Sequence, residues 1–79
     1  MLIFDRFNST ERAEEFAAYV TAEWGKPATV RHIDGEGRQP DLYPFRIDNP
    51  YVEVARGSLE VEYAIESAVT QFGGSFAGT

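Results

Sequence analysis

Hydrophobic positions in the second half of the chain change from a strand-like spacing to a helical one. Val52 and Val54 alternate with Tyr51, Glu53 and Ala55, which predicts a strand over Tyr51–Ala55. After the turn residues Arg56-Gly57-Ser58, the spacing predicts one helical stripe made of Val61, Ile65, Ala68, Val69 and Phe72. Ser58 is suited to cap the start of this helix, and Gly73 is suited to cap its end.

The same segment has a second interpretation. Residues Leu59 to Tyr63 also alternate, so Arg56-Gly57 would then be the turn of a β-hairpin. The helix is favoured because its apolar stripe continues to Phe72, which is farther than a strand usually runs.

The first half of the chain has the same order of strand and helix, followed by another strand. Alternating residues predict a strand over Leu2–Phe7. A helix then opens at Asn8, which would form a capping box with Glu11, with Ser9 as the competing cap. It ends at Gly25, and its buried stripe is Ala13, Phe16, Ala17, Val20 and Trp24. The β-branched stretch Ala28–Ile33 predicts a strand parallel to the first, reached by a right-handed crossover.

Residues Asp34 to Pro50 break this regular pattern. The part from Asp34 to Pro40 is rich in turn residues, and Tyr43, Phe45 and Ile47 then alternate as a short edge strand would. We expect Tyr43 or Phe45 to anchor this segment to the body of the domain. A last strand is expected over Ser75–Gly78.

This order of elements defines a fold class. We expect one α+β domain over residues 1–79, with the β-α-β-β-α-β order of a ferredoxin-like sandwich. Two helices should cover one face of a mainly antiparallel sheet, and the expected core is Phe16, Val20, Trp24, Ile65, Val69 and Phe72.

Composition narrows the classes of function. The chain has no cysteine, so neither a disulfide nor a thiolate metal site is expected, and a cytoplasmic location fits. Thirteen acidic and seven basic residues give a net charge of −6, which disfavours nucleic acid and anionic lipid and favours a cationic partner. No apolar run approaches the ~18 residues of a membrane span. The stretch Met1–Phe4 is too short for a signal peptide, so we expect no membrane association.

The sequence predicts no catalytic, metal or cofactor site. His32 is the only histidine, and although it would share a strand face with Asp34, an ordinary structural role is favoured. Asp34-Gly-Glu36 begins like a calcium loop, but Arg38 and Gln39 stand where the pattern needs the next ligand and glycine. An RNA-recognition surface is disfavoured, because the arginines are scattered and acidic residues would face the phosphates. We therefore expect a protein that is not an enzyme and has no cofactor.

A resemblance gives a sharper expectation. The ending Gln71-Phe72-Gly73-Gly74-Ser75-Phe76-Ala77-Gly78-Thr79, after a strand that begins Asn49-Pro50-Tyr51-Val52, resembles small phage proteins. Among these, the chain is similar in size, acidity and lack of cysteine to the anti-CRISPR proteins. The resemblance implies a stoichiometric inhibitor that binds a type I CRISPR effector, the Cascade complex, in the host cytoplasm and blocks its binding to target DNA.

Candidate partner-binding residues are the acids outside the core stripes and the aromatic residues near them. They are Asp34, Glu36, Asp41, Tyr43 and Phe45 in the long connection, and Glu11, Glu14 and Glu15 in the first helix. Glu62 and Glu66 in the second helix are also expected to be accessible. The alternative function is a phage accessory or assembly protein that self-associates or binds a virion component. The chain is expected to be a monomer or a weak homodimer.

Overall fold

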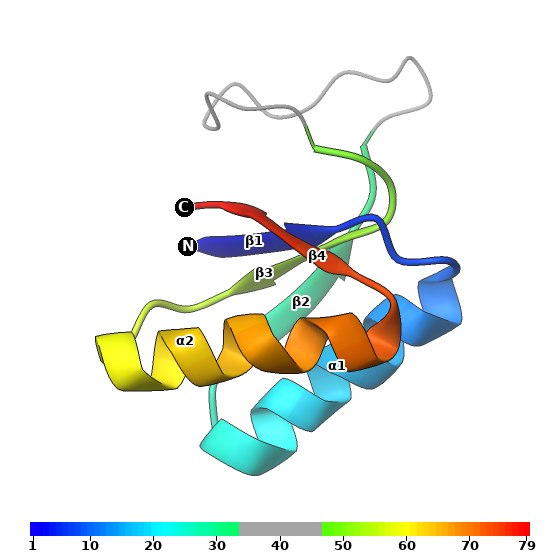
Figure 1. Ribbon diagram of the computed structural model, residues 1–79. Helices are drawn as coiled ribbons and strands as arrows, with labels where there is room; N and C mark the ends of the chain where they lie inside the picture. Colours follow the sequence, from blue (N-terminus) through cyan, green and yellow to red (C-terminus); the bar gives the residue numbers. More distant parts are fainter. Residues whose placement is uncertain (34–46) are drawn as a thin grey trace.

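The fold is defined by a computed structural model that describes residues 1–33 and 47–79 (Figure 1). Its elements are β1 (Leu2–Asp5), α1 (Thr10–Trp24), β2 (Ala28–Arg31), β3 (Tyr51–Val54), α2 (Leu59–Ala68), the 3-10 helix η1 (Val69–Phe72) and β4 (Ser75–Gly78). The predicted order of strands and helices is confirmed, and with it the α+β class.

The four strands form one sheet in the order β2-β3-β1-β4, and every pair of neighbours is antiparallel. Because β1 and β2 are both antiparallel to β3, they run in the same direction with β3 between them. Both helices lie on one side of this sheet (Figure 1), which is the ferredoxin-like arrangement predicted from the sequence.

Three strands end earlier than predicted: β3 stops at Val54, one residue before Ala55, and the ends of β1 and β2 have local reasons. β1 ends at Asp5, two residues early, because Arg6 has a left-handed backbone with φ of 63° that a strand does not continue through. β2 ends at Arg31, because the backbone N–H of Ile33 donates to the side chain of Asn49 and not to a neighbouring strand.

Side-chain caps set the start of each helix. Ser9 caps α1 by accepting a hydrogen bond from the backbone N–H of Arg12, so the expected Asn8 cap is wrong and the competing residue is correct. Gly25 ends α1 in the left-handed conformation with φ of 64°, as predicted. Ser58 caps α2 by accepting from the backbone N–H of Val61, which confirms that prediction.

The segment from Leu59 to Tyr63 is helical, so the β-hairpin interpretation is excluded. The helix keeps α-helical geometry as far as Ala68, and the last four residues tighten into η1 before Gly73, whose φ is 80°. Tightening of the last turn is common where a helix approaches a glycine cap. The predicted stripe faces the sheet, with Ile65 and Val69 fully buried.

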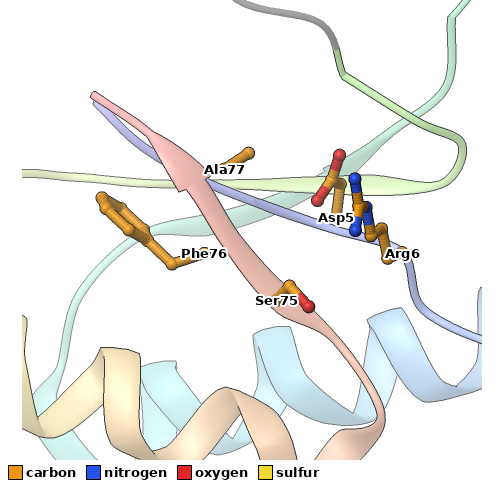
Figure 2. Close-up of a pocket in the computed structure, with 5 residues that line it drawn as sticks. All are labelled: Asp5, Arg6, Ser75, Phe76 and Ala77. Carbon is orange, nitrogen blue, oxygen red and sulfur yellow. The ribbon is translucent and has the colours of Figure 1, made fainter.

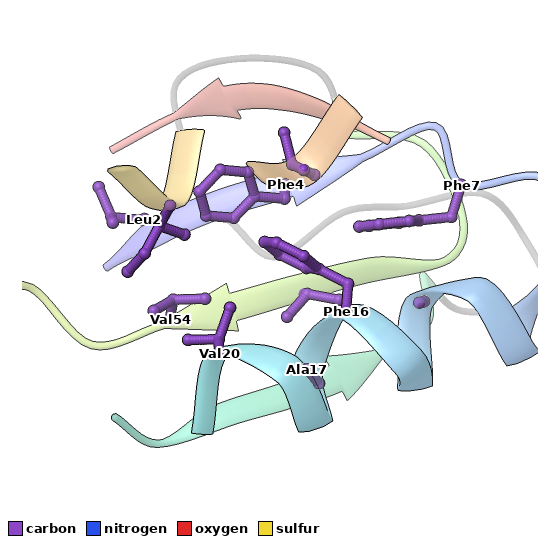
Figure 3. Close-up of a cluster of buried hydrophobic side chains, with 11 residues drawn as sticks. Leu2, Phe4, Phe7, Phe16, Ala17, Val20 and Val54 are labelled. Atoms are coloured by element: carbon purple, nitrogen blue, oxygen red, sulfur yellow. The ribbon is translucent and has the colours of Figure 1, made fainter. Parts of the chain in front are cut away.

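The main core lies between the helices and the sheet (Figure 3). Its buried side chains are Leu2, Phe4, Phe7, Ala13, Phe16, Ala17, Val20, Val52, Val54, Ile65 and Val69. Phe16 is central, because its ring lies 5.1 Å from that of Phe4 and 5.6 Å from that of Phe7. Trp24 and Phe72 were expected in the core but are only partly buried, since both lie at its margin.

A smaller apolar cluster lies on the opposite face of the sheet. Ile3, Ile47 and Tyr51 are buried there, with Ile33 and Ala77 partly buried against them. Ile47 is 1% exposed, so the chain returns from the long connection directly onto this face. The remainder of the predicted edge strand, Tyr43 to Arg46, lies outside the described residues.

Candidate partner-binding surface on helix α1

The acidic residues predicted for the first helix share its outward face. Glu11, Glu14 and Glu15 are all exposed, whereas the core stripe of α1 lies on the opposite side of the helix. Their spacing of three and four residues places them next to one another on the helix surface. The structure therefore brings these three predicted residues together.

Arg12 fixes one end of this face to the C-terminal end of the second helix. Its Nη1 lies 2.7 Å from a carboxylate oxygen of Glu15, and its Nη2 donates to the backbone carbonyl of Gln71 at 2.7 Å. The guanidinium also lies over the ring of Phe72, 5.4 Å from its centroid. These contacts link Glu15, through Arg12, to the end of η1.

A row of aromatic rings runs alongside the acidic residues. Tyr19 is 36% exposed, and its ring lies 5.4 Å from that of Phe72 and 5.6 Å from that of Trp24. Along α1, Glu15 precedes Tyr19 by four residues and Glu23 follows it by four. We call the exposed residues Glu11, Glu14, Glu15, Tyr19 and Glu23, with Trp24 and Phe72 at their edge, the acidic-aromatic surface.

Sequence reasoning did not identify Tyr19 as part of this surface. It assigned Trp24 and Phe72 to the core and looked for aromatic anchors in the long connection. The available signal was the spacing of Glu15, Tyr19 and Glu23, which lines up an aromatic side chain between two carboxylates on one helix face.

The other predicted partner-binding residues lie outside the described residues. These are Asp34, Glu36, Asp41, Tyr43 and Phe45. Their place as candidates comes from the sequence alone.

Glu62 was expected to be accessible, and the structure contradicts this. Its side chain is buried, with the residue 4% exposed, and it accepts hydrogen bonds from the backbone N–H of Gly57 at 2.9 Å and from Nε of Arg56 at 3.0 Å. The N–H of Gly57 and the guanidinium of Arg56 lower the pKa of this carboxyl below its ordinary value. Glu62 therefore stabilises the turn between β3 and α2, while Glu66 on the next turn is half-buried.

A hollow of about 210 Å³ lies where β1 ends beside β4 (Figure 2). It is lined by Asp5, Arg6, Ser75, Phe76 and Ala77. Asp5 is only 3% exposed and accepts a hydrogen bond from the backbone N–H of Asp48 at 2.9 Å, while Arg6 lies 3.5 Å from the Asp48 carboxylate. The two charged groups of the hollow thus link the end of β1 to the segment after the long connection.

His32 lies on the surface and contacts the first residue of α1. The exposed His32 has its Nε2 3.3 Å from the hydroxyl of Thr10, which is an ordinary surface contact. Within residues 1–33 and 47–79, no group of three or more His, Cys, Asp or Glu side chains is arranged to hold a metal ion. Among the described residues, Tyr51 also has a shifted pKa: burial and the Glu53 carboxylate raise it, while Arg31 opposes the rise.

No protein-family model, curated protein or solved structure matches this chain. In the part of the chain that the structure describes, neither helix is long and apolar enough to cross a membrane.

Proposed function

We propose that this protein is a stoichiometric, anti-CRISPR-like inhibitor that binds a cationic surface of a type I CRISPR effector and blocks its binding to target DNA. The observation that carries the proposal is the acidic-aromatic surface of α1. It places four exposed glutamates and an exposed aromatic ring along a well-packed helix. The resemblance in size, acidity and composition to the anti-CRISPR proteins supplies the class of partner.

The charge of the chain supports this kind of binding. An effector that holds a DNA strand presents a positively charged channel. A protein with a net charge of −6 is attracted to such a channel, and complementary charges mainly raise the association rate. Aromatic side chains that fill a partner's pocket then contribute more to affinity than exposed charges do.

Charge reversal on α1 tests whether this helix contacts the effector. We expect the double variant Glu11→Lys, Glu14→Lys to weaken competition with target DNA for a purified type I effector by at least about 10-fold, because attraction becomes repulsion. The matched control is Glu60→Lys with Glu66→Lys, which makes the same change in net charge on α2. Equal loss in both variants would show that only net charge matters and would contradict a surface located on α1.

The long connection remains part of the proposal. Sequence reasoning ranks Asp34, Glu36 and Asp41 above the helix acids, because Tyr43 and Phe45 are close to them in sequence. Reversal of these three acids to lysine should therefore weaken inhibition more than reversal of Glu11, Glu14 and Glu15, with thermal stability nearly unchanged. A stronger effect of the helix triple would move the centre of the interface to α1.

The second candidate function is a phage accessory or assembly protein that self-associates or binds a virion component. One observation favours it: among the described residues no strand pairs with the outer edge of β4, whose residues Ser75–Gly78 carry no charge. β4 has only four residues, and its register with β1 shifts, two features that limit pairing at an edge. Measurement of solution mass against concentration separates this candidate from a monomeric inhibitor.

A further inference from the structure

The contacts of Arg12 show which cation fits the acidic-aromatic surface. Its guanidinium lies over the ring of Phe72, pairs with the carboxylate of Glu15 and donates to a backbone carbonyl. A flat, delocalised cation can stack on a ring and bind a carboxylate edge at the same time, whereas an ammonium cannot do both in the same way. One end of the surface is therefore already occupied by an arginine of the chain itself.

Tyr19, the next ring in the row, also has aromatic contacts and has glutamates near it along the helix. Tyr19 contacts Phe72 on one side and Trp24 on another, so its ring is held in place by two aromatic contacts. Glu15 lies one helical turn before Tyr19 and Glu23 lies one turn after it, and both are exposed. Along α1, Tyr19 thus lies between two exposed glutamates, and one carboxylate oxygen of Glu15 is already paired with Arg12.

We infer that Tyr19, Glu15 and Glu23 form a docking site for an arginine side chain of a cationic protein partner. The guanidinium would stack on the exposed part of the Tyr19 ring and donate to Glu23 and to the Glu15 carboxylate oxygen that Arg12 leaves open, much as Arg12 lies over Phe72 and pairs with Glu15. Charge complementarity selects a cationic occupant, and the exposed ring selects arginine over lysine. This inference rests on the proposed function for the class of partner, a cationic protein surface, and names the side chain that is recognised.

Nucleic acid is a poor occupant of the same surface. Bases stack on aromatic residues, but each base brings a phosphate, and the carboxylates of Glu15 and Glu23 would repel it. A second copy of the chain is also disfavoured, because two acidic helix faces would oppose each other. An arginine-bearing protein segment satisfies both the ring and the carboxylates.

Trp24 provides a direct reporter, because it is the only tryptophan and its indole contacts Tyr19. Hexa-arginine and hexa-lysine peptides, which carry the same charge, are titrated into the full chain while tryptophan fluorescence is followed. We expect hexa-arginine to bind about 2- to 5-fold more tightly than hexa-lysine at the same salt concentration, from stacking on Tyr19.

The variants separate the ring from the charge. Tyr19→Leu should abolish the preference for arginine over lysine, and Tyr19→Phe should retain it, since phenylalanine keeps the ring. The matched control is Tyr63→Leu on α2, where another exposed tyrosine is removed and the preference should persist. Circular dichroism melting of each variant establishes that the fold is kept. If Tyr19→Leu unfolds, Glu23→Gln decides the question, because it should reduce the preference for hexa-arginine while the matched exposed change Glu60→Gln on α2 should not.

The inference is overturned by equal binding of the two peptides, by a preference that survives Tyr19→Leu in the folded protein, or by one that Tyr63→Leu removes. Failure here is distinct from failure of the proposed function. A chain that prefers arginine peptides but does not bind a type I effector would keep this site and lose the proposed target. A chain that inhibits the effector without an arginine preference would keep the proposed function and lose the arginine site.

Discussion

Replacement of Phe16 is the sharpest test of how the domain is held together. Its side chain is fully buried, and its ring contacts those of Phe4, Phe7 and Phe72 at centroid distances of 5.1, 5.6 and 5.6 Å. Truncation to alanine removes these contacts and leaves a cavity, which costs about 3–5 kcal/mol in the free energy of unfolding. A domain of this length has a total stability of about 4–12 kcal/mol, so Phe16→Ala should remove a large share of it.

The assay is urea unfolding followed by circular dichroism, together with thermal melting. For a domain of this size each kcal/mol corresponds to about 4–8 °C in melting temperature, so Phe16→Ala should melt at least about 12 °C below the parent or be unfolded at room temperature. Phe16→Leu keeps most of the apolar volume and should lose less than half as much. The surface control Tyr63→Ala should stay within about 0.5 kcal/mol of the parent, because this residue is 62% exposed.

A loss below about 1 kcal/mol for Phe16→Ala would refute this reasoning. It would mean that the helices and sheet do not meet at this residue, and the packing in Figure 3 would have to be wrong. A loss in Phe16→Leu equal to that in Phe16→Ala would instead show that ring contacts, and not buried volume, dominate the core.

Three further predictions concern the elements around this core. In the folded chain the pKa of Glu62 lies below its ordinary value of 4.5. The ionised Glu62 carboxylate therefore stabilises the fold above pH 4.5, and this stabilisation is lost as the pH falls through the folded pKa. Glu62→Gln should therefore flatten the loss of stability on acidification from about pH 6 to pH 3, as measured by urea unfolding at each pH. Gly73→Ala should lower the melting temperature more than Gly25→Ala. Both glycines have positive φ, but an added Cβ at Gly73 would lie 3.1 Å from the side-chain nitrogen of Asn8, whereas the space at Gly25 is open. Ile47→Ala should cost about 2–5 kcal/mol in urea unfolding if the cluster opposite the helices contributes to stability, and a change near zero would show that it does not.

The order of elements could be predicted from the sequence because local signals agreed with one another. The apolar stripe through Ile65 and Val69, the Ser58 cap and the Gly73 stop all indicated the same helix. Each signal depends on residues within a few positions of each other, so no tertiary information was needed. The choice between Asn8 and Ser9 as a cap was harder, because both residue types serve and the backbone decides which one does.

The features that were missed depend on contacts between distant segments. The carbonyl of Gln71 that Arg12 binds is 59 residues away along the chain, so the aromatic row that includes Phe72 and Tyr19 is visible only in the folded structure. Glu62 was assigned to solvent because helical glutamates are usually exposed. Its burial depends on the N–H of Gly57 and the side chain of Arg56, which the turn before α2 directs at it.

The most direct test of the proposed function is a titration of the unmodified chain into a purified type I effector with labelled target DNA, repeated from about 50 to 500 mM salt. The account predicts that DNA binding is lost at a fixed molar ratio of inhibitor to effector, without turnover. It also predicts that apparent affinity falls as salt increases, because the acidic surface is screened. DNA binding that is undisturbed even at the lowest salt concentration would contradict the inhibitor function. Tight inhibition that does not change across the salt series would contradict the acidic surface as its cause.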